Sequence, residues 1–180
     1  MACLKKLNLD ITFDCTNLMS VSGVRKIEEA IIINSDDISN IAVSDGDGTV
    51  TMKKGTKGYI VNSINNSVIY QDAIKTNDLT PSFEDHTVII KALTSYASWS
   101  AYRLLIQQLL QGNFRVAMKT ADGRCYLAGT YSGLEASDLA TDSSADGIST
   151  VTLKTPDAAS GDVLVALSTA EYEALKVLKA

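Results

Sequence analysis

The only histidine of the chain, His86, is the first residue whose type could carry out acid–base chemistry. It directly follows Glu84 and Asp85, and an imidazole beside a carboxylate can act as a general base. A histidine at the start of a strand is more commonly an ordinary surface residue. One histidine and three scattered cysteines also do not make the ligand pattern of a zinc site. The sequence therefore favours a surface histidine without a catalytic role.

A serine flanked by glycines at residues 129–133 (GTYSG) raises the question of acyl transfer. A nucleophile elbow has the spacing GxSxG and joins a strand to a long helix. Here the spacing is GxxSG and no long helix is predicted to follow, so we interpret both glycines as turn residues. The phosphate-binding patterns GxGxxG and GxxxxGK[ST] are also absent. We expect no enzyme, no catalytic residue and no cofactor.

Two acidic segments could bind a cation. Residues 45–48 (DGDG) resemble the start of a calcium loop, but Val50 and Met52 occupy later positions that an EF-hand fills with oxygen ligands. Asp138, Asp142 and Asp146 are spaced four apart among small residues that favour a loop. We predict a hairpin tip at the first segment and no metal site, with a weak divalent-cation site at the three aspartates as the alternative.

The overall charge argues against a protein that grips nucleic-acid phosphates. The formal net charge is −5, whereas such a protein needs a basic stripe. Lys53, Lys54 and Lys57 come closest to one, and we interpret them as a solvated loop tip. The odd cysteine count (Cys3, Cys15 and Cys125) indicates free thiols in a reducing compartment. Neither a signal peptide nor a stretch long enough to span a membrane is evident, so we expect folding in a cytoplasm.

Strand patterns dominate the chain. Alternation of apolar and polar residues, β-branched runs and Asp-Gly turns predict strands at residues 7–13, 24–33, 41–43, 49–52, 58–61, 68–73, 82–93, 114–120, 124–127, 148–155 and 163–167. Residues 58–61 and 68–73 are expected to pair with each other. Residues 129–147 read as a small, polar, acidic loop. In residues 148–155, Val151 and Leu153 are expected to face the core.

One run of apolar residues departs from alternation. Ala30, Ile31, Ile32 and Ile33 are consecutive, and three of them are β-branched. Such a run is typical of a strand buried on both faces, or of a strand whose outer face meets another subunit. The sequence alone leaves both possibilities open.

Two helices are predicted. From residue 96 to 111 the apolar residues, including the only tryptophan, Trp99, recur at helical spacing. Thr94 or Ser95 would cap its start, Gly112 would end it in a left-handed conformation, and Trp99 would face the core. Residues 168–171 (STAE) have the spacing of a capping box and open a terminal helix with Tyr172, Leu175 and Leu178 on one side.

No linker or repeat divides the chain, so we expect a single domain over residues 1–180. A single sheet of roughly nine or ten strands would curl or split. The predicted fold class is therefore mainly β, a β-sandwich or half-barrel with one flanking amphipathic helix and a short C-terminal helix.

The order of these elements resembles that of phage tail-tube proteins, particularly those of phages and prophages of Bacteroidetes-type hosts. The resemblance covers about residues 5–155 and is one of arrangement rather than of a signature motif. The terminal helix from Thr169 fits it less well. The segments that carry it are residues 23–34 (GVRKIEEAIIIN), 36–38 (DDI), 104–110 (LLIQQLL), 123–129 (GRCYLAG) and 146–148 (DGI).

The resemblance implies a virion protein that assembles in the host cytoplasm into rings, usually hexameric, stacked around a channel. DNA would pass without specific binding because an acidic lumen repels phosphates. Loops at residues 49–57 and 132–147 would join neighbouring rings, and the β-branched run would close a sheet between subunits. The predicted interface residues are Ala30, Ile31, Ile32, Ile33, Thr49, Met52, Lys53, Lys54 and Lys57.

Three alternatives remain. The first is another virion component, namely a capsid decoration, a head–tail connector or a tail terminator. The second is a ligand-binding β-sandwich such as a carbohydrate module, which the expected burial of Trp99 disfavours because such a module needs an exposed aromatic platform. The third is an enzyme, which would require His86.

Overall fold

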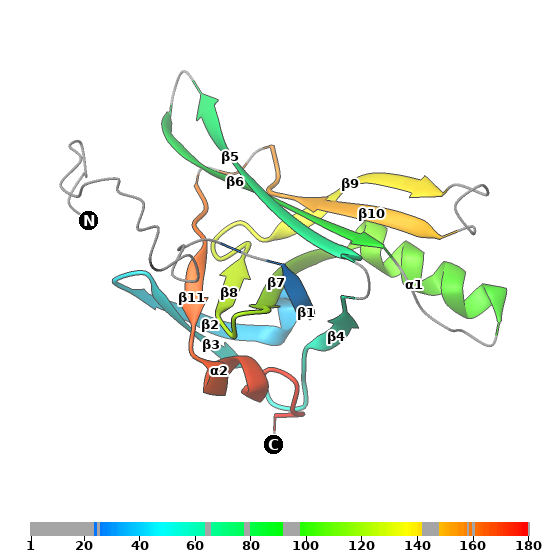
Figure 1. The fold of residues 1–180 in the computed structure, drawn as a ribbon, viewed down its shortest axis with the longest axis horizontal. Coiled ribbons are helices and arrows are strands. Elements are labelled where there is room, and N and C mark those ends of the chain that lie inside the picture. The colour runs from blue at the N-terminus through cyan, green and yellow to red at the C-terminus, as the bar shows by residue number, and fades with distance from the viewer. Residues whose placement is uncertain are drawn as a thin grey trace, which may run out of the picture.

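The computed structural model shows a mainly β protein with two helices, which confirms the predicted fold class (Figure 1). It describes residues 24, 26–63, 66–77, 80–91, 98–141, 148–157, 159 and 161–179. The strand predicted at residues 7–13 lies outside this part of the chain, as do Cys3, Cys15, Asp142 and Asp146.

The strands all belong to one open sheet. They are β1 (Ile27–Asn34), β2 (Ile38–Ser44), β3 (Asp47–Met52), β4 (Tyr59–Asn62), β5 (Val68–Asn77), β6 (Thr80–Lys91), β7 (Asn113–Thr120), β8 (Cys125–Ala128), β9 (Leu134–Thr141), β10 (Ser149–Lys154) and β11 (Val165–Leu167). The helices are α1 (Trp99–Gln111), α2 (Thr169–Ala174) and the 3-10 turn η2 (Ser35–Asp37).

The sheet branches at β7. Its order is β2-β3-β11-β8-β7-β9-β10-β6-β5, and β1 lies on the other edge of β7 and carries β4 on its own far edge. Only the pairing of β11 with β3 is parallel. On the edge of β7 away from β1, Val116–Lys119 pair with β8, whereas Asn113 and Phe114 pair with the start of β9. The sheet therefore divides at this strand. The strands on the β9 side, which are β9, β10, β6 and β5, are here called the outer sheet.

The central strands, β1, β7 and β8, are buried on both faces. Ala30 and Ile32 point into one cluster of core residues, which also contains residues of β5, β6, β10 and α1. Ile31 and Ile33 point into a second cluster, formed with β3, β11 and α2. Both edges of β1 are paired, one with β4 and the other with β7. The β-branched run is thus covered inside the chain, and the alternative of an outer face that meets another subunit does not apply to it.

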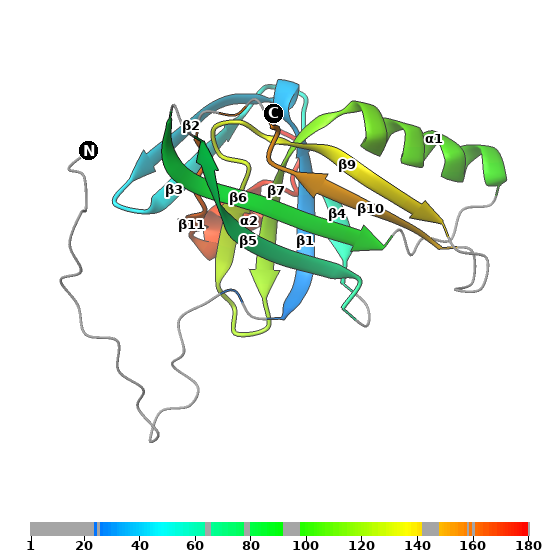
Figure 2. The same cartoon turned by 90° about the horizontal axis from the view of Figure 1, so that it is seen from above.

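The outer sheet follows the period-two alternation of a sheet with only one face in the core. Val68, Ile90 and Val151 are cross-strand neighbours on its inner face and are at most 3% exposed. The inward placement of Val151 and Leu153 confirms that prediction. Helix α1 packs against β9 and β10. From above, β9, β10, β6 and β5 lie side by side, with α1 beyond β9 (Figure 2).

The hairpins were predicted correctly where an Asp-Gly pair marks the turn. Asp45 and Gly46 have φ angles of +52° and +92°, as a tight two-residue turn between β2 and β3 requires. The β7–β8 hairpin turns at Gly123, where φ is +84°.

Two predictions for segments without such a turn were wrong. Strand β4 pairs with β1, and β5 pairs with β6, so residues 58–61 and 68–73 do not form a hairpin. Strand β9 occupies part of the segment that was predicted to be a loop at residues 129–147. The strand predicted at residues 49–52 is confirmed as part of β3, so the loop expected at residues 49–57 begins only after Met52. The pairing of β4 with β1 joins segments distant in sequence, and local composition does not specify it.

Helix α1 exists as predicted, but its orientation differs. Its N-cap is Ser98, whose side chain accepts a hydrogen bond from the Ala101 N–H (3.3 Å), and Gly112 is extended at φ −88°. Ile106 and Leu109 are the residues of α1 that are buried. Trp99 is 68% exposed, so the expectation that it faces the core was wrong. It occupies the first turn, where the helix extends past the edge of the core (Figure 1).

Helix α2 begins with the predicted capping box, because Ser168 and Glu171 each accept a hydrogen bond from the other's backbone N–H. Its apolar side covers the second core cluster through Tyr172 and Leu175. The Tyr172 hydroxyl donates to Glu29 Oε1 of β1 (3.2 Å). Leu178 was predicted to share one side of this helix with Tyr172 and Leu175, but it lies beyond the helix and is 60% exposed.

Candidate functional sites

His86 is completely buried, which corrects the expectation of a surface residue. It lies on the inner face of β6, and its Nδ1 is 2.8 Å from the hydroxyl of Tyr70 on β5. Its Nε2 is 3.7 Å from Glu84 Oε2. Its backbone N–H donates to Thr155 Oγ1 (2.9 Å), and its carbonyl accepts from the Thr155 N–H (3.0 Å). These contacts connect the outer strands with the segment that follows β10.

The tautomer of His86 follows from its two neighbours. Burial, with the nearby carboxylates Asp72, Glu84 and Asp162 adding to it, raises the pKa of Tyr70, so the phenol keeps its proton and can donate it to Nδ1. The ring proton then lies on Nε2, which is 3.7 Å from Glu84 Oε2, too far for a hydrogen bond, so this buried nitrogen has no hydrogen-bond partner among the described residues. The reverse arrangement would bring a nitrogen lone pair toward a carboxylate. Glu84 Oε2 also accepts the Leu164 N–H (2.9 Å), which fixes its position.

This arrangement has the members of a Glu–His–Tyr relay but none of the access that catalysis requires. A general base must reach a substrate atom within hydrogen-bonding distance, and His86 has no exposed surface. The ring of Tyr70 stacks against the imidazole with centroids 5.9 Å apart. We therefore interpret the cluster as a buried polar network that aligns β5 and β6.

The glycine-flanked serine is part of a turn, as predicted. Gly129 and Gly133 have φ angles of +78° and +72°. Ser132 Oγ donates to Asp162 Oδ2 (2.8 Å), and Asp162 Oδ1 accepts the backbone N–H groups of Tyr131 and Val163. Asp162 thereby joins this turn to the segment before β11.

The structure describes one of the three cysteines, Cys125, and one of the three regularly spaced aspartates, Asp138. Cys125 is a buried free thiol whose pKa is raised by burial, so little reactive thiolate forms. Asp138 lies exposed on β9. Within the residues that the structure describes, no group of three potential metal ligands comes together. None of the helices in that part is long and apolar enough to cross a membrane.

The predicted interface residues divide into buried and exposed ones. The four residues of the β-branched run and Met52 are at most 7% exposed. Thr49 is exposed on β3 but forms a hydrogen bond with the Glu171 side chain. Lys53, Lys54 and Lys57 are exposed on the loop after β3, where the Lys53 ammonium donates to the Asp36 carbonyl (2.6 Å). Of the predicted interface residues, the three lysines are therefore the ones whose exposed side chains offer a contact surface.

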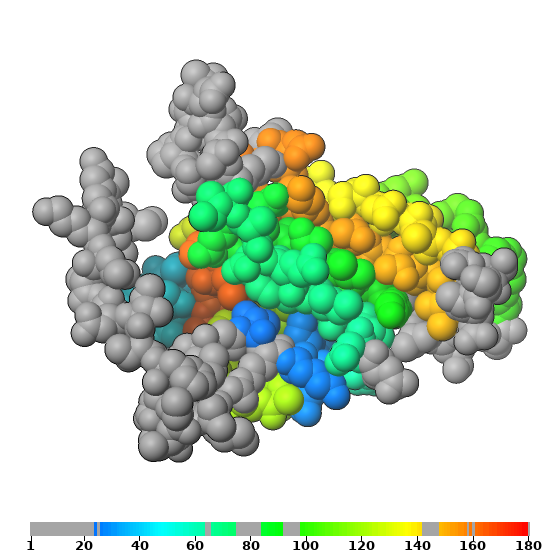
Figure 3. Space-filling view, turned by 45° about the horizontal axis from the view of Figure 1, so that its top comes forward, coloured from blue at the N-terminus to red at the C-terminus, as the bar shows by residue number. Residues whose placement is uncertain are grey.

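Within the described residues, the outer sheet has two edges without a full strand partner, which the sequence did not reveal, and α1 lies beyond one of them (Figure 2). Strand β5 ends the sheet and has no partner beyond β6 within the described residues. On β9, only Leu134 and Glu135 pair with β7, so the remaining residues lack a strand on that edge in the same part of the chain. Figure 3 shows β5, β6, β10 and β9 side by side across one face of the molecule.

The outer face of this sheet is polar for most of its length. Cross-strand neighbours form two rows there, both half-exposed or exposed: Ile69, Ile89, Thr152 and Asp138 in one, and Gln71, Thr87, Lys154 and Glu135 in the other. The only signal for these edges in the sequence was alternation, which indicates a two-sided strand but not whether its edge is paired.

Because Trp99 is exposed, the protein has the kind of surface aromatic side chain that a ligand-binding module would need. Arg103 lies over its ring (5.8 Å to the centroid), and Tyr102 packs beside it (5.8 Å between centroids). The Tyr102 hydroxyl is engaged by the Ser149 N–H (2.9 Å). With a cation over one face, this group is not the open platform that a carbohydrate would stack on.

No protein family, no curated protein and no solved structure matches this chain. The described residues form a mainly β protein with a buried centre and an outer sheet whose edges lack a strand partner in that part of the chain.

Proposed function

We propose that this chain is a structural subunit of a phage tail tube, which forms stacked rings, usually hexameric in such tubes, around a DNA-conducting channel. The observation that carries this proposal is the outer sheet, with two unpaired edges and one half-exposed polar face. An unpaired strand edge is a template for pairing with another chain. The resemblance in element order adds to this support.

The two edges of the outer sheet differ, which favours rings over dimers. Joining β5 of one copy to β9 of the next uses two different surfaces, and such a heterologous contact closes into a ring when the rotation between copies allows it. The outer sheets of all copies would then form one continuous cylinder wall. The two inner strands of each copy's part of this wall, β6 and β10, are already paired with each other within the chain.

The polar face of the outer sheet suits the lining of such a channel. Its two rows carry Asp138 and Glu135 against Lys154, and threonines lie between them. A weakly acidic, hydroxyl-rich wall does not hold phosphates, so DNA can slide along it. DNA is therefore cargo in this proposal, and no specific contact with it is expected.

Electron microscopy of the purified full chain by negative stain tests the proposal. Rings or tubes are expected at high protein concentration. A chain that stays monomeric at high concentration, without rings or tubes, would contradict it. Rings that never stack would instead favour a connector or tail terminator.

Proline substitutions in the edge strand test the proposed wall directly. Successive backbone N–H groups of an edge strand point alternately to its partner and to the free side. Of the variants Gln71→Pro and Asp72→Pro, one should therefore lose a hydrogen bond to β6 and melt at lower temperature. The other should keep its melting temperature and abolish rings.

A matched control lies at another end of the sheet. Strand β2 is also terminal, and proline in place of Ile41 or of Ala42, which lie in its regularly paired part, probes its edge in the same way. The β2 variant that keeps its melting temperature should still form rings. If both stable variants form rings, β5 does not join subunits.

A further inference from the structure

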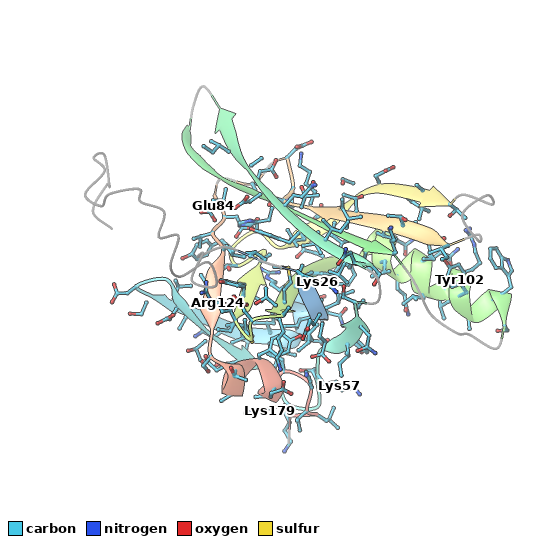
Figure 4. The ribbon with its side chains drawn as sticks, in the orientation of Figure 1. Lys26, Lys57, Glu84, Tyr102, Arg124 and Lys179 are labelled. Atoms are coloured by element: carbon cyan, nitrogen blue, oxygen red, sulfur yellow. The ribbon has the colours of Figure 1, made fainter. Side chains whose placement is uncertain are left out.

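One end of the molecule carries exposed lysines in a fixed arrangement. The loop after β3 is bound to the C-terminal residues by three backbone hydrogen bonds: Gly55 N–H to the Lys179 carbonyl (2.8 Å), Lys179 N–H to the Thr56 carbonyl (3.0 Å) and Gly58 N–H to the Leu175 carbonyl (2.8 Å). These bonds bring Lys179 beside the lysines of the loop. Lys57 and Lys179 project together at the lower end of the molecule (Figure 4).

Two large apolar side chains accompany these lysines. Val177 is 66% exposed and Leu178 is 60% exposed, directly before Lys179. The surface formed by Lys53, Lys54, Lys57, Val177, Leu178 and Lys179 is here called the lysine end. Apolar residues within a charged rim are typical of a contact surface between proteins.

The opposite end carries the complementary chemistry. The β5–β6 hairpin projects beyond the core at the upper end of the molecule (Figure 1). On it, Ile74 is 76% exposed and lies directly across from Glu84, with Asp72 exposed two residues away on the same strand. Asp72, Ile74 and Glu84 are here called the acidic end.

The two ends carry charges of opposite sign, and both contain exposed aliphatic side chains. Each places exposed aliphatic side chains beside charges, positive at one end and negative at the other. Near the acidic end, the ammonium of Lys154 is already engaged by Asp85 (3.2 Å). Burial raises the pKa of Tyr70, and the nearby carboxylates of Asp72, Glu84 and Asp162 raise it further, so these three negative charges lie around one side chain.

We infer that the lysine end of one copy binds the acidic end of a second copy. Because the two surfaces lie at opposite ends, the contact repeats from copy to copy without closing. It deepens the proposed function and rests on it, since it supplies the axial contact between rings that side-by-side pairing of outer sheets does not. Opposite charges across the contact also set the polarity of the stack.

Charge reversal at each end tests the contact. The variant Lys54→Glu/Lys57→Glu/Lys179→Glu has two acidic ends, because Lys53 is then the one remaining lysine of its reversed end. The variant Asp72→Lys/Glu84→Lys has two basic ends. Each alone should stack at least about tenfold more weakly than the wild-type chain, measured by sedimentation and by tube length in negative stain. Mixed in equal amounts, the two variants should form stacks again, because each reversed end meets the reversed end of the other variant.

Matched controls carry the same change of net charge elsewhere. Lys26→Glu/Lys91→Glu/Arg103→Glu and Glu28→Lys/Asp47→Lys alter exposed side chains away from the two ends, and both should stack like the wild-type chain. Because Glu84 also accepts the Leu164 N–H, Asp72→Lys alone serves as a second variant that keeps this bond. It should weaken stacking in the same direction. Melting curves verify that each variant is folded.

The outcomes separate this contact from the proposed function. Rings that stack equally in all variants would overturn the contact and leave the tail-tube proposal standing. Restored end-to-end chains that never contain rings would support the contact and overturn the tail tube. If only the lysine variant matters and mixing restores nothing, the lysine end binds something other than the acidic end. A chain that never associates overturns both.

Discussion

The central strands and the outer sheet use the same kind of residues for different purposes. In β1, alternate isoleucines point into two separate core clusters, so neither face is free. In β5 and β6, one face lies in the core and the other carries Ile69, Ile89 and polar residues at half-exposed or exposed positions. A β-branched run thus indicates burial on both faces only where elements cover both sides. For β1, α2 and β11 cover one side, and α1 and the outer sheet cover the other.

This difference separates stability from association. Substitutions in the central strands should lower the free energy of unfolding, and substitutions on the free surfaces of the outer sheet should change assembly with little effect on stability. Paired substitutions in the two regions distinguish these effects, and the largest loss of stability is expected at Ile31 and the smallest at the cap of α2.

Ile31→Ala should lower the free energy of unfolding by about 2–5 kcal/mol, because the side chain is fully buried and its loss leaves a cavity. Ile69→Ala, at a position that is 36% exposed on β5, should cost about 1 kcal/mol or less. Urea unfolding of both variants measures the difference. Equal losses would show that the outer face of β5 is as well packed as β1.

Gly133→Ala should lower the free energy of unfolding by about 2–3 kcal/mol. Gly133 lies in the corner between β8 and β9, directly before the residues of β9 that pair with the start of β7. Gly133 has a φ angle of +72°, and an added Cβ would overlap Asn113 Oδ1. Asn113 cannot move freely, because its amide donates to Glu135 Oε1 (3.0 Å) and accepts from Arg115 Nη1 (3.0 Å).

The control for this corner is Gly123→Ala in the β7–β8 turn. Its φ angle of +84° creates similar backbone strain, but nothing lies within 4 Å of the added Cβ. It should cost about 1 kcal/mol, so the difference between the two thermal melts reports the collision. A larger loss at Gly123 would refute the role of the corner.

Tyr70→Phe should cost about 1–3 kcal/mol, because it leaves the buried Nδ1 of His86 without a donor. The comparison is Tyr131→Phe, at a side chain that is 54% exposed, which should change stability by no more than about 0.5 kcal/mol. Chemical denaturation distinguishes them. An unchanged Tyr70→Phe protein would mean that the polar network does not stabilise the outer sheet.

Ser168→Ala should cost about 1 kcal/mol by removing the N-cap of α2, which covers the central strands.

The pKa of Glu171 is lowered, first by the hydrogen bond from Thr49 and then by those from Ser168. A lowered pKa in the folded state stabilises the protein above the ordinary value of 4.5, and this contribution is lost as the pH falls through the folded value.

The pH dependence of Glu171→Gln checks that sign. Its stability deficit relative to the wild-type chain should be constant at neutral pH and shrink below pH 4.5. Since α2 covers the centre of the fold, the deficit should appear in melting temperature and not in ring formation. A deficit that grows in acid would contradict the assignment.

The sequence by itself determined the local features of this protein. The Asp-Gly turns at residues 45–46 and 122–123, the capping box at Ser168 and the alternation around Val151 each depend on hydrogen bonds or φ angles within a few residues. It also indicated the mainly β class, because strand patterns recur along the chain.

Only the tertiary structure decided which edges and faces remain free. The burial of His86, the exposure of Trp99, the strand at Leu134–Thr141 and the two covers over β1 depend on residues far away in sequence. A side chain's pattern gives the face it shares with its neighbours, but not what packs against that face. The surfaces proposed for assembly follow from those distant contacts, because an edge is free only where no other segment pairs with it.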